Sequence, residues 1–274
     1  MGRLTGRVAW VTGSSRGIGR VVADHLASLG ANVAIHGTTP TSTQQLGEGD
    51  SLAAVADEIA KAHGTEILPV HGDLTDEAVV AGNVADIRER FGKIDILINN
   101  AGGDIGSKGV TAENAGKPIQ NDAIHIPLEE VDTIINRNLR TCILVTRAVV
   151  PEMMERNEGW VVTVGSIAGL SGHPSEVSYS VSKAAVHEYT KCLAAQLRPN
   201  GVYANVIAPG EIITPRFEAS RPTKDDRKVE QGPLTRYGWP IEVAKAIEFL
   251  VTSDSSYITG QVLRVDGGAQ LWPA

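Results

Sequence analysis

The sequence predicts one α/β domain over residues 1–274, with a doubly wound parallel sheet of about seven strands and helices on both faces. Three observations lead to this fold class. Short apolar runs alternate with longer segments of helical periodicity along the chain. The first apolar run, Val8 to Val11, leads directly into a glycine-rich turn and a helical pattern. A chain of 274 residues with 42% hydrophobic residues can bury a sizeable core as one such domain.

The apolar runs and the helical patterns define the expected elements in chain order. The apolar runs predict strands at Val8–Thr12, Val33–His36, Ile67–His71, Ile94–Asn99, Trp160–Val164, Tyr203–Ile207 and Val262–Val265. Segments with a helical period predict helices at Gly17–Leu29, Leu52–His63, Glu77–Phe91, Leu128–Arg156, Ser178–Leu197 and Ile241–Leu250. Strict alternation implies parallel strands joined by right-handed crossovers, and such sheets bind ligands beyond the carboxyl ends of their strands.

The turn from Thr12 to Gly19 predicts a site for the diphosphate of a dinucleotide. Because glycine carries no side chain, a diphosphate can approach the backbone, and the following helix offers unpaired amides at its N-terminus. Tight turns also use glycine for steric reasons alone, so the turn by itself is weak support. The whole turn is assigned to cofactor contact, that is Gly13, Ser14, Ser15, Arg16, Gly17, Ile18 and Gly19.

Tyr179 and Lys183 form a second candidate site, with Ser166 a short distance upstream. A four-residue spacing places both side chains on one face of a helix, so an ammonium can lie beside a phenol. A free tyrosine has a pKa of about 10, and a close, partly desolvated cation can lower it toward neutrality. The same spacing occurs on ordinary surface helices, and the glycine turn at the other end of the chain is what favours a catalytic pair.

From about Gly6 to Gly268 the chain resembles the short-chain dehydrogenase/reductase family in its compact, classical type, which has a Rossmann-type fold. The matching pieces follow one another in the order that the family shows, and their joint occurrence by accident is improbable. They are the Thr12–Gly19 turn, Asp73, Asn99-Asn100-Ala101-Gly102, Asn138, Ser166, Tyr179 with Lys183, Pro209-Gly210 and the closing Thr259-Gly260 to Asp266-Gly267-Gly268.

This resemblance implies hydride exchange between a nicotinamide and a carbonyl carbon. Tyr179 would act as the general acid and base, and Ser166 would donate a hydrogen bond to the same substrate oxygen. Lys183 would lower the pKa of Tyr179 and hold the nicotinamide ribose. Asn138 matches the asparagine that supports a water relay to the lysine, with Asn136 as the alternative register. The remaining cofactor contacts implied are Gly37, Thr38, Asp73, Leu74, Asn100, Ala101, Gly102, Tyr179, Lys183, Pro209, Gly210, Ile212 and Thr214.

The end of the second predicted strand favours NADP over NAD, although NAD remains possible. Members of the family that prefer NAD usually place an acid there to hold the adenosine ribose, whereas this chain has Gly37 and Thr38. No carboxylate is therefore expected to repel a 2′-phosphate. Arg16 is similar to the basic residue of NADP-using relatives, and a guanidinium suits phosphate geometry.

The substrate-binding residues are the least defined part of the sequence. The resemblance makes residues 210–239 a mobile lid, and Arg216 in this lid and His173 in the loop before Tyr179 are the substrate candidates. The lid's cations allow an anionic substrate, but charge runs usually face water, which favours a solvated loop. Two insertions, Thr39–Asp50 and the loop over residues 103–126, lengthen the family pattern, and the second is expected to wall the pocket.

Bulk composition predicts a cytoplasmic protein that binds neither nucleic acid nor membranes. The net charge is −7, and no basic stripe is present to neutralise a phosphate backbone. No apolar stretch approaches a membrane span, and the N-terminus lacks the hydrophobic region of a signal peptide. Cys142 and Cys192 are interpreted as reduced packing residues, and seven histidines without ligand spacing predict no catalytic metal. The family resemblance implies a homotetramer, in which Leu271 and Trp272 could be buried by a neighbouring subunit.

The favoured function is an NAD(P)-dependent oxidoreductase acting on a secondary alcohol or ketone of a small molecule such as a polyol, sugar or ketone. A 3-oxoacyl carrier-protein reductase activity is the alternative, although Asn157 and Asn200 stand where those enzymes usually present arginines to the acidic carrier. A non-catalytic NADP-binding regulatory protein would be expected to lose Tyr179, Lys183 or Ser166, and all three are present. Epimerases and dehydratases of the extended branch normally add a C-terminal substrate domain.

Overall fold

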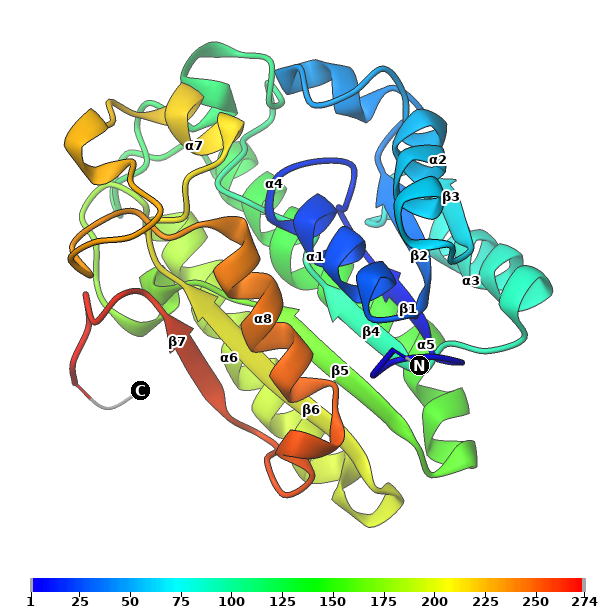
Figure 1. The fold of residues 1–274 in the computed structure, drawn as a ribbon. Helices are drawn as coiled ribbons and strands as arrows, with labels where there is room; N and C mark the ends of the chain where they lie inside the picture. The colour runs from blue at the N-terminus through cyan, green and yellow to red at the C-terminus, as the bar shows by residue number, and fades with distance from the viewer. Residues whose placement is uncertain (1, 273–274) are drawn as a thin grey trace.

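The seven strands of the computed structural model form one sheet in the order β3-β2-β1-β4-β5-β6-β7 (Figure 1). The model describes residues 2–272, so Met1 and the last two residues of the expected 1–274 domain lie outside it. The strands are β1 (Val8–Val11), β2 (Asn32–Gly37), β3 (Ile67–His71), β4 (Ile96–Asn99), β5 (Gly159–Val164), β6 (Val202–Pro209) and β7 (Val262–Val265). Every neighbouring pair runs parallel, which confirms the predicted fold class.

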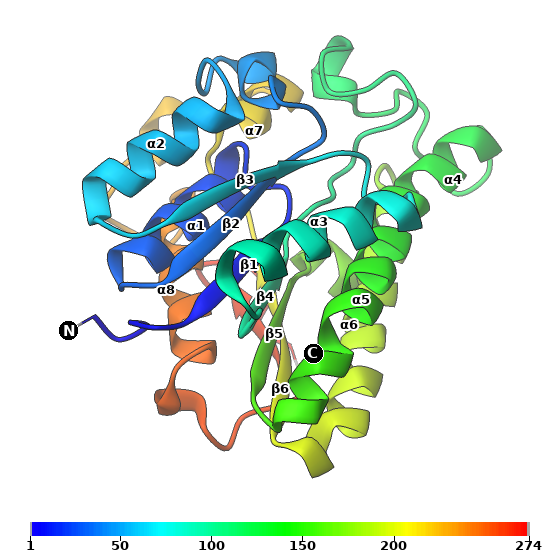
Figure 2. The same cartoon turned by 90° about the vertical axis from the view of Figure 1, so that its right-hand side faces the viewer.

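Helices cover both faces of this sheet, as Figure 2 shows edge-on. They are α1 (Gly17–Ser28), α2 (Leu52–His63), α3 (Glu77–Phe91), α4 (Leu128–Ile135), α5 (Thr141–Arg156), α6 (Val177–Leu197), α7 (Pro215–Ser220) and α8 (Pro240–Leu250). Helices α1, α2 and α8 lie on one face, and α3, α5 and α6 lie on the other. Strand β1 serves both layers because successive side chains alternate: Ala9 and Val11 face the first, and Val8 and Trp10 face the second.

The candidate site lies where the strand order reverses, between β1 and β4. The ends of these strands are joined through Thr12, whose Oγ1 accepts hydrogen bonds from the backbone amides of Asn100 and Ala101, each at 3.0 Å. Gly13 has a φ of +62°, and a Cβ there would lie 2.8 Å from the Cα of Ala101. Only glycine therefore lets the two strand ends approach this closely.

The structure corrects the predicted helix Leu128–Arg156, which is divided into α4 and α5 by a π-helical turn at Asn136–Arg140. Turns of this kind insert an extra residue and are frequent at functional sites. The six-residue helix α7 was not predicted. It begins because the Oγ1 of Thr214 accepts the amide of Phe217 at 3.1 Å and Pro215 occupies the first turn.

The other predicted bounds agree to within two residues. Strand β4 begins at Ile96 rather than Ile94, and the carboxylate of the preceding Asp95 accepts the amide of Val8 at 2.9 Å. Within residues 2–272, no helix is both long and apolar enough to span a bilayer.

The two insertions lie above the carboxyl edge of the sheet, on the same side as α7 (Figure 1). The segment Thr39–Asp50 contains a 3₁₀ turn at Ser42–Leu46. The loop over residues 103–126 contains a 3₁₀ turn at Glu113–Gly116 that packs on α7. Both insertions therefore border the place where the sequence predicts ligands.

Candidate active site

A cleft of about 740 Å³ runs along the carboxyl ends of the strands. Most of the residues assigned from the sequence line it, although they come from every part of the chain. They are Gly13, Ser15, Arg16, Gly17, Ile18, Gly19, Gly37, Thr38, Asp73, Leu74, Asn100, Ala101, Gly102, Ser166, His173, Tyr179, Lys183, Pro209, Gly210, Ile212, Thr214 and Arg216. Two assigned residues, Ser14 and Asn138, lie behind the cleft wall instead.

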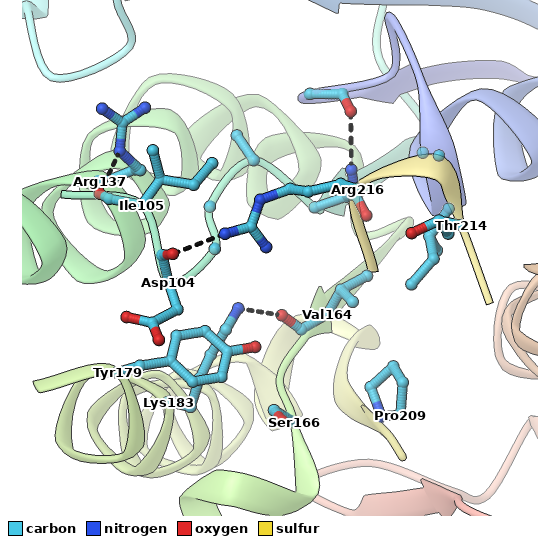
Figure 3. Close-up of a pocket in the computed structure, with 18 of the residues that line it drawn as sticks. Asp104, Ile105, Arg137, Val164, Ser166, Tyr179, Lys183, Pro209, Thr214 and Arg216 are labelled. Carbon is cyan, nitrogen blue, oxygen red and sulfur yellow. Dashed lines mark hydrogen bonds between the residues drawn. The ribbon is translucent and has the colours of Figure 1, made fainter. Parts of the chain in front are cut away.

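Tyr179, Lys183 and Ser166 face the same space in the cleft (Figure 3). The first two lie on α6, and Ser166 follows β5. The Nζ of Lys183 donates a hydrogen bond of 2.8 Å to the carbonyl of Val164 and lies 5.7 Å from the centre of the Tyr179 ring. Ser166 is fixed at the start of a 3₁₀ turn, because its Oγ accepts the amide of Ala168 at 3.1 Å. The arrangement can give a proton and a hydrogen bond to one substrate oxygen.

Burial controls the protonation of both ionisable groups in this arrangement. It raises the pKa of Tyr179, against the opposing effects of a hydrogen bond with Ser166 and the charge of Arg216. It also lowers the pKa of Lys183 to about 8, because removal from water penalises the ammonium. The lowering of the Tyr179 pKa that the sequence predicts from Lys183 is not seen here: removal from water is the largest influence on the phenol, and Lys183 is not among the groups that shift its pKa.

The hydrogen bonds of the Asn138 side chain go to backbone atoms of two segments. Its Oδ1 accepts the amide of Gly103 at 2.9 Å, and its Nδ2 donates to the carbonyls of Gly103 at 3.0 Å and Ile134 at 2.8 Å. A Cβ on Gly102 would lie 2.4 Å from the same Oδ1. Asn138 thus anchors the chain after β4 beside Lys183, while Asn136, the alternative register, lines the cleft. The water relay stays a prediction.

His36 is a structural residue of the site that the sequence did not reveal. Its Nδ1 accepts the amide of Gly13 at 3.2 Å and its Nε2 donates to the carbonyl of Gly72 at 3.0 Å, so one neutral imidazole joins the ends of β1, β2 and β3. The ring is buried, and burial lowers its pKa to about 4. Ser14 reinforces the same junction, because its Oγ donates to Val11 and accepts the amide of His36.

The insertion Thr39–Asp50 brings an acid to the glycine turn. The Oε2 of Glu48 accepts the amide of Gly17 at 2.7 Å, at the N-terminus of α1. Arg16 reaches the same insertion, donating to the carbonyl of Ser42 at 2.9 Å and to the Oε1 of Gln45 at 2.7 Å. The end of β2 carries Gly37 and Thr38, as the sequence indicates, but the insertion brings the carboxylate of Glu48 into the same cleft. Glu48 comes from a loop, and no periodicity or motif could have placed it.

The two substrate candidates differ in their surroundings. His173 is exposed, and its Nδ1 lies 3.2 Å from the Oγ of Ser175 within its own loop. Arg216 is withdrawn from water and contacts the backbone of Asp104. The charge pattern predicted that the cations of the lid face water, and this prediction is wrong for Arg216. Arg137 is a further cation of the cleft wall that the sequence did not reveal, and its Nε donates to the carbonyl of Ile105 at 3.2 Å.

Comparison with known proteins finds relatives along nearly the whole chain. A family model described as "Enoyl-(Acyl carrier protein) reductase" matches residues 13–270. The chain is 35% identical over 268 residues to the 3-oxoacyl-[acyl-carrier-protein] reductase of Aquifex aeolicus, covering 97% of this chain and 98% of the relative. It is 38% identical over 274 residues to the cyclohexanol dehydrogenase of a Rhodococcus species, covering 97% and 96%.

Solved structures of similar proteins share the fold of this chain over nearly its whole length. A 7α-hydroxysteroid dehydrogenase complexed with NADH and 7-oxo glycochenodeoxycholic acid superposes with a TM-score of 0.82 at 27% identity, covering 97% of this chain and 95% of the other. A 3-oxoacyl-[acyl-carrier protein] reductase of Brucella melitensis with bound NAD has a TM-score of 0.80 at 28% identity, covering 98% and 95%.

The His36 junction predicts a loss of stability in acid. The folded-state pKa of about 4 lies below the ordinary value of 6.5, so the unfolded chain binds more protons between these values. The contribution of His36 is therefore complete above pH 6.5 and is lost as the pH falls toward 4, by roughly 3 kcal/mol. Urea unfolding of the wild type and His36→Gln should show a stability gap at pH 7 that narrows toward pH 4.

His173→Gln serves as the stability control, because that side chain is exposed in the loop before α6 and is not among the groups that shift the pKa of His36. The difference in unfolding free energy between this control variant and the wild type should be small and independent of pH. A His36→Gln gap that stayed constant from pH 7 to pH 4 would contradict the buried, neutral imidazole.

Proposed function

Because the chain belongs to the short-chain dehydrogenase/reductase family, we propose that Tyr179, Ser166 and Lys183 catalyse hydride exchange between a nicotinamide cofactor and the carbonyl carbon of a small molecule. Family membership makes the protein an oxidoreductase that uses a nicotinamide cofactor. The observation that carries the proposal for these residues is their convergence, with the glycine turn, on one cleft.

The glycine turn fits a dinucleotide. A Cβ on Gly19 would lie 2.4 Å from the Nδ2 of Asn100 and 2.5 Å from the carbonyl oxygen of Gly13, so glycine is what lets the first turn of α1 pack closely against the end of β1. The carboxylate of Glu48 on the amide of Gly17 is an anion already held at the N-terminus of α1. When bound, the nicotinamide supplies or accepts the hydride. The residues from Gly13 to Gly19 would hold the diphosphate, and Lys183 would lie on the ribose side.

The protonation states favour carbonyl reduction near neutral pH. Burial keeps the Tyr179 phenol protonated, which is the form that can give a proton to the forming alkoxide. Ser166 stabilises the same oxygen with its hydroxyl. Lys183, with a pKa of about 8, is mainly an ammonium at pH 7, and the carbonyl of Val164 fixes its position. In the reverse direction the Tyr179 phenolate must take the proton from the alcohol, and burial disfavours this form near neutral pH.

A carrier-bound 3-oxoacyl substrate is the second candidate, because several of the relatives are 3-oxoacyl-[acyl-carrier-protein] reductases. Asn157 and Asn200 stand where such reductases usually present arginines, and neither side chain offers a positive charge to an acidic carrier. Asn157 adopts a left-handed conformation with a φ of +53° at the end of α5, which asparagine tolerates well. Asn200 donates to the carbonyl of Met154 at 3.4 Å. A small free ketone or alcohol therefore remains the favoured substrate class.

Tyr179→Phe should lower kcat for ketone reduction by about 10²-fold or more, because the proton donor is removed while the ring stays. The affinity for the cofactor should change little. Absorbance of the reduced nicotinamide measures turnover with a panel of ketones, sugars and polyols, and fluorescence titration measures binding. Tyr189→Phe is the matched control, since Tyr189 lies on the same helix outside the cleft. Turnover of Tyr179→Phe close to that of the control contradicts the assigned role.

We further propose a preference for NADP, with Arg16 as the group that holds the 2′-phosphate. The partners of Arg16 are a carbonyl and an amide oxygen, both neutral, so an anionic phosphate can replace them. Thr38 lies in the same part of the cleft, at the end of β2. Glu48 opposes this preference, because its charge lies close to the same cation.

Two variants separate these effects. Arg16→Gln should weaken NADPH binding about tenfold or more and leave NADH binding nearly unchanged. Glu48→Gln removes a negative charge without changing the size of the side chain, so it should tighten NADPH binding. Glu155→Gln, an exposed residue of α5 with no ion pair among the described residues, is the control. Fluorescence titration of both cofactors decides the question: tighter binding of NADH by the wild type, or weaker NADPH binding by Glu48→Gln, contradicts the preference.

We also propose that the protein acts as a homotetramer in the cytoplasm. Leu271 and Trp272 are 85% and 49% exposed in the single chain, and a neighbouring subunit would remove these apolar side chains from water. Light scattering should give the mass of four subunits, and a single-subunit mass contradicts the assembly. Cell fractionation should recover the activity in the soluble cytoplasmic fraction, and recovery with membranes contradicts that location.

A further inference from the structure

We propose that the substrate carries a carboxylate and that Arg216 binds it in front of the Tyr179 phenol. This inference names a substrate class for the proposed oxidoreductase and therefore rests on that function. It follows from the position of Arg216, from the absence of a protein anion to compensate its charge, and from the chemistry of the guanidinium group.

The position of Arg216 is fixed by α7 and by the chain after β4. The Thr214 cap starts α7, which places Arg216 in the first turn of the helix. Its Nη2 donates a 2.6 Å hydrogen bond to the carbonyl of Asp104, and its Nη1 lies 3.6 Å from where a Cβ on Gly103 would stand. Figure 3 shows the guanidinium reaching across the cleft, on the side opposite Tyr179 and Ser166. The side chain is therefore held over the space where the reacting carbon must lie.

The charge of Arg216 has no anionic partner among residues 2–272. None of the ion pairs found in that range includes Arg216, and its Nε is buried without a hydrogen-bond acceptor. Removal from water lowers the pKa of the guanidinium from its ordinary value, while the nearby phenol and Asp104 act in the opposite direction. Buried cations are normally paired, because an uncompensated one is costly. A bound anion would supply the missing partner.

The acids nearest to Arg216 form no ion pair with it. The Oδ1 of Asp104 accepts from the Nδ2 of Asn121 at 2.9 Å, whereas its Oδ2 is buried without a hydrogen-bond partner in the described chain and lies 4.0 Å from the Nζ of Lys117. The charge of Asp104 therefore acts on Arg216 only at longer range. Glu176 forms a close ion pair with Lys117 and lies 3.7 Å from Arg221. Arg221 is thereby compensated, and it also stacks over the ring of Phe217 at 4.7 Å. Of the three cations Lys117, Arg221 and Arg216, only Arg216 is without an ion pair in the part of the chain that the structure describes. Arg137, the other arginine of this wall that is unpaired within residues 2–272, donates its Nε to the carbonyl of Ile105, whereas the Nε of Arg216 has no acceptor there.

A carboxylate is the anion that best fits this place. The planar guanidinium offers parallel donors that match the two oxygens of a carboxylate. Because Arg216, Tyr179 and Ser166 line the same part of one cleft (Figure 3), a carboxylate bound by Arg216 would lie near the carbonyl being reduced. The substrate class is therefore a short oxo acid, and its product is the corresponding hydroxy acid. The competing role for Arg216 is contact with the diphosphate of the cofactor, and a cofactor titration separates the two.

The test compares acids with their methyl esters, which differ mainly in charge. The 2-oxo, 3-oxo and 4-oxo acids of four or five carbons and their esters are reduced with NADPH, and kcat/KM is measured by absorbance. The wild type should favour at least one acid over its ester by tenfold or more. Arg216→Gln should abolish this preference: kcat/KM for the acid should fall, and kcat/KM for the ester should stay within about threefold of the wild type. Arg216→Lys should retain part of the preference.

Arg221→Gln is the matched control, because it removes a neighbouring cation that is already paired. This variant should keep the preference for the acid. The affinity of Arg216→Gln for NADPH should stay within twofold of the wild type, and a large loss there would assign Arg216 to the cofactor and overturn the proposal. Equal reduction of acids and esters by the wild type would overturn it as well, as would turnover of uncharged ketones alone. Reduction of neither the acids nor the esters would also overturn it, and the proposed oxidoreductase function would fail with it only if the panel of ketones, sugars and polyols gave no turnover either.

Discussion

The removal of ionisable groups from water at the carboxyl edge of the sheet is the constraint on which the site depends. Tyr179, Lys183 and Arg216 lie within one cleft, and burial shifts the pKa of each toward its neutral form. Lys183 is held by a backbone carbonyl rather than by a carboxylate. A carboxylate would neutralise the ammonium permanently, whereas a carbonyl fixes its position and leaves the charge available to an anionic or hydroxylated ligand. The cleft is therefore prepared for ligands that bring negative charge or hydrogen-bond acceptors.

A small number of buried polar contacts hold this edge together. Thr12 ties the end of β1 to the chain after β4, and His36 ties the same turn to β2 and to the chain after β3. Asn138 holds Gly103 from the π turn between α4 and α5. Each contact joins segments that are far apart in the sequence, and each uses a side chain whose donors and acceptors are satisfied by backbone. The position of the catalytic groups thus depends on residues that do not touch the substrate.

The sequence predicted those features that arise from local pattern. Apolar alternation and helical period located all seven strands and six helical segments, and the spacing of Tyr179 and Lys183 placed both on one face of α6. Features that depend on loop conformation could not be predicted. Glu48 reaches Gly17 only because the 3₁₀ turn at Ser42–Leu46 folds the insertion back. The charge pattern around Arg216 was typical of a solvated loop, and only the contact of α7 with the chain after β4 withdraws it from water. The direction of the Tyr179 pKa shift could not be predicted for a related reason, because spacing shows a neighbouring cation but not the loss of solvent.

The acidity of Tyr179 without added cofactor tests the central claim most directly. Ionisation of tyrosine can be followed by ultraviolet absorbance near 295 nm, and subtracting the titration of Tyr179→Phe isolates this one phenol among five tyrosines. If desolvation dominates, the difference titration will place the pKa of Tyr179 above its ordinary value of about 10. A difference titration that places it near 7 would contradict the account, because it would show that the ammonium of Lys183 outweighs burial.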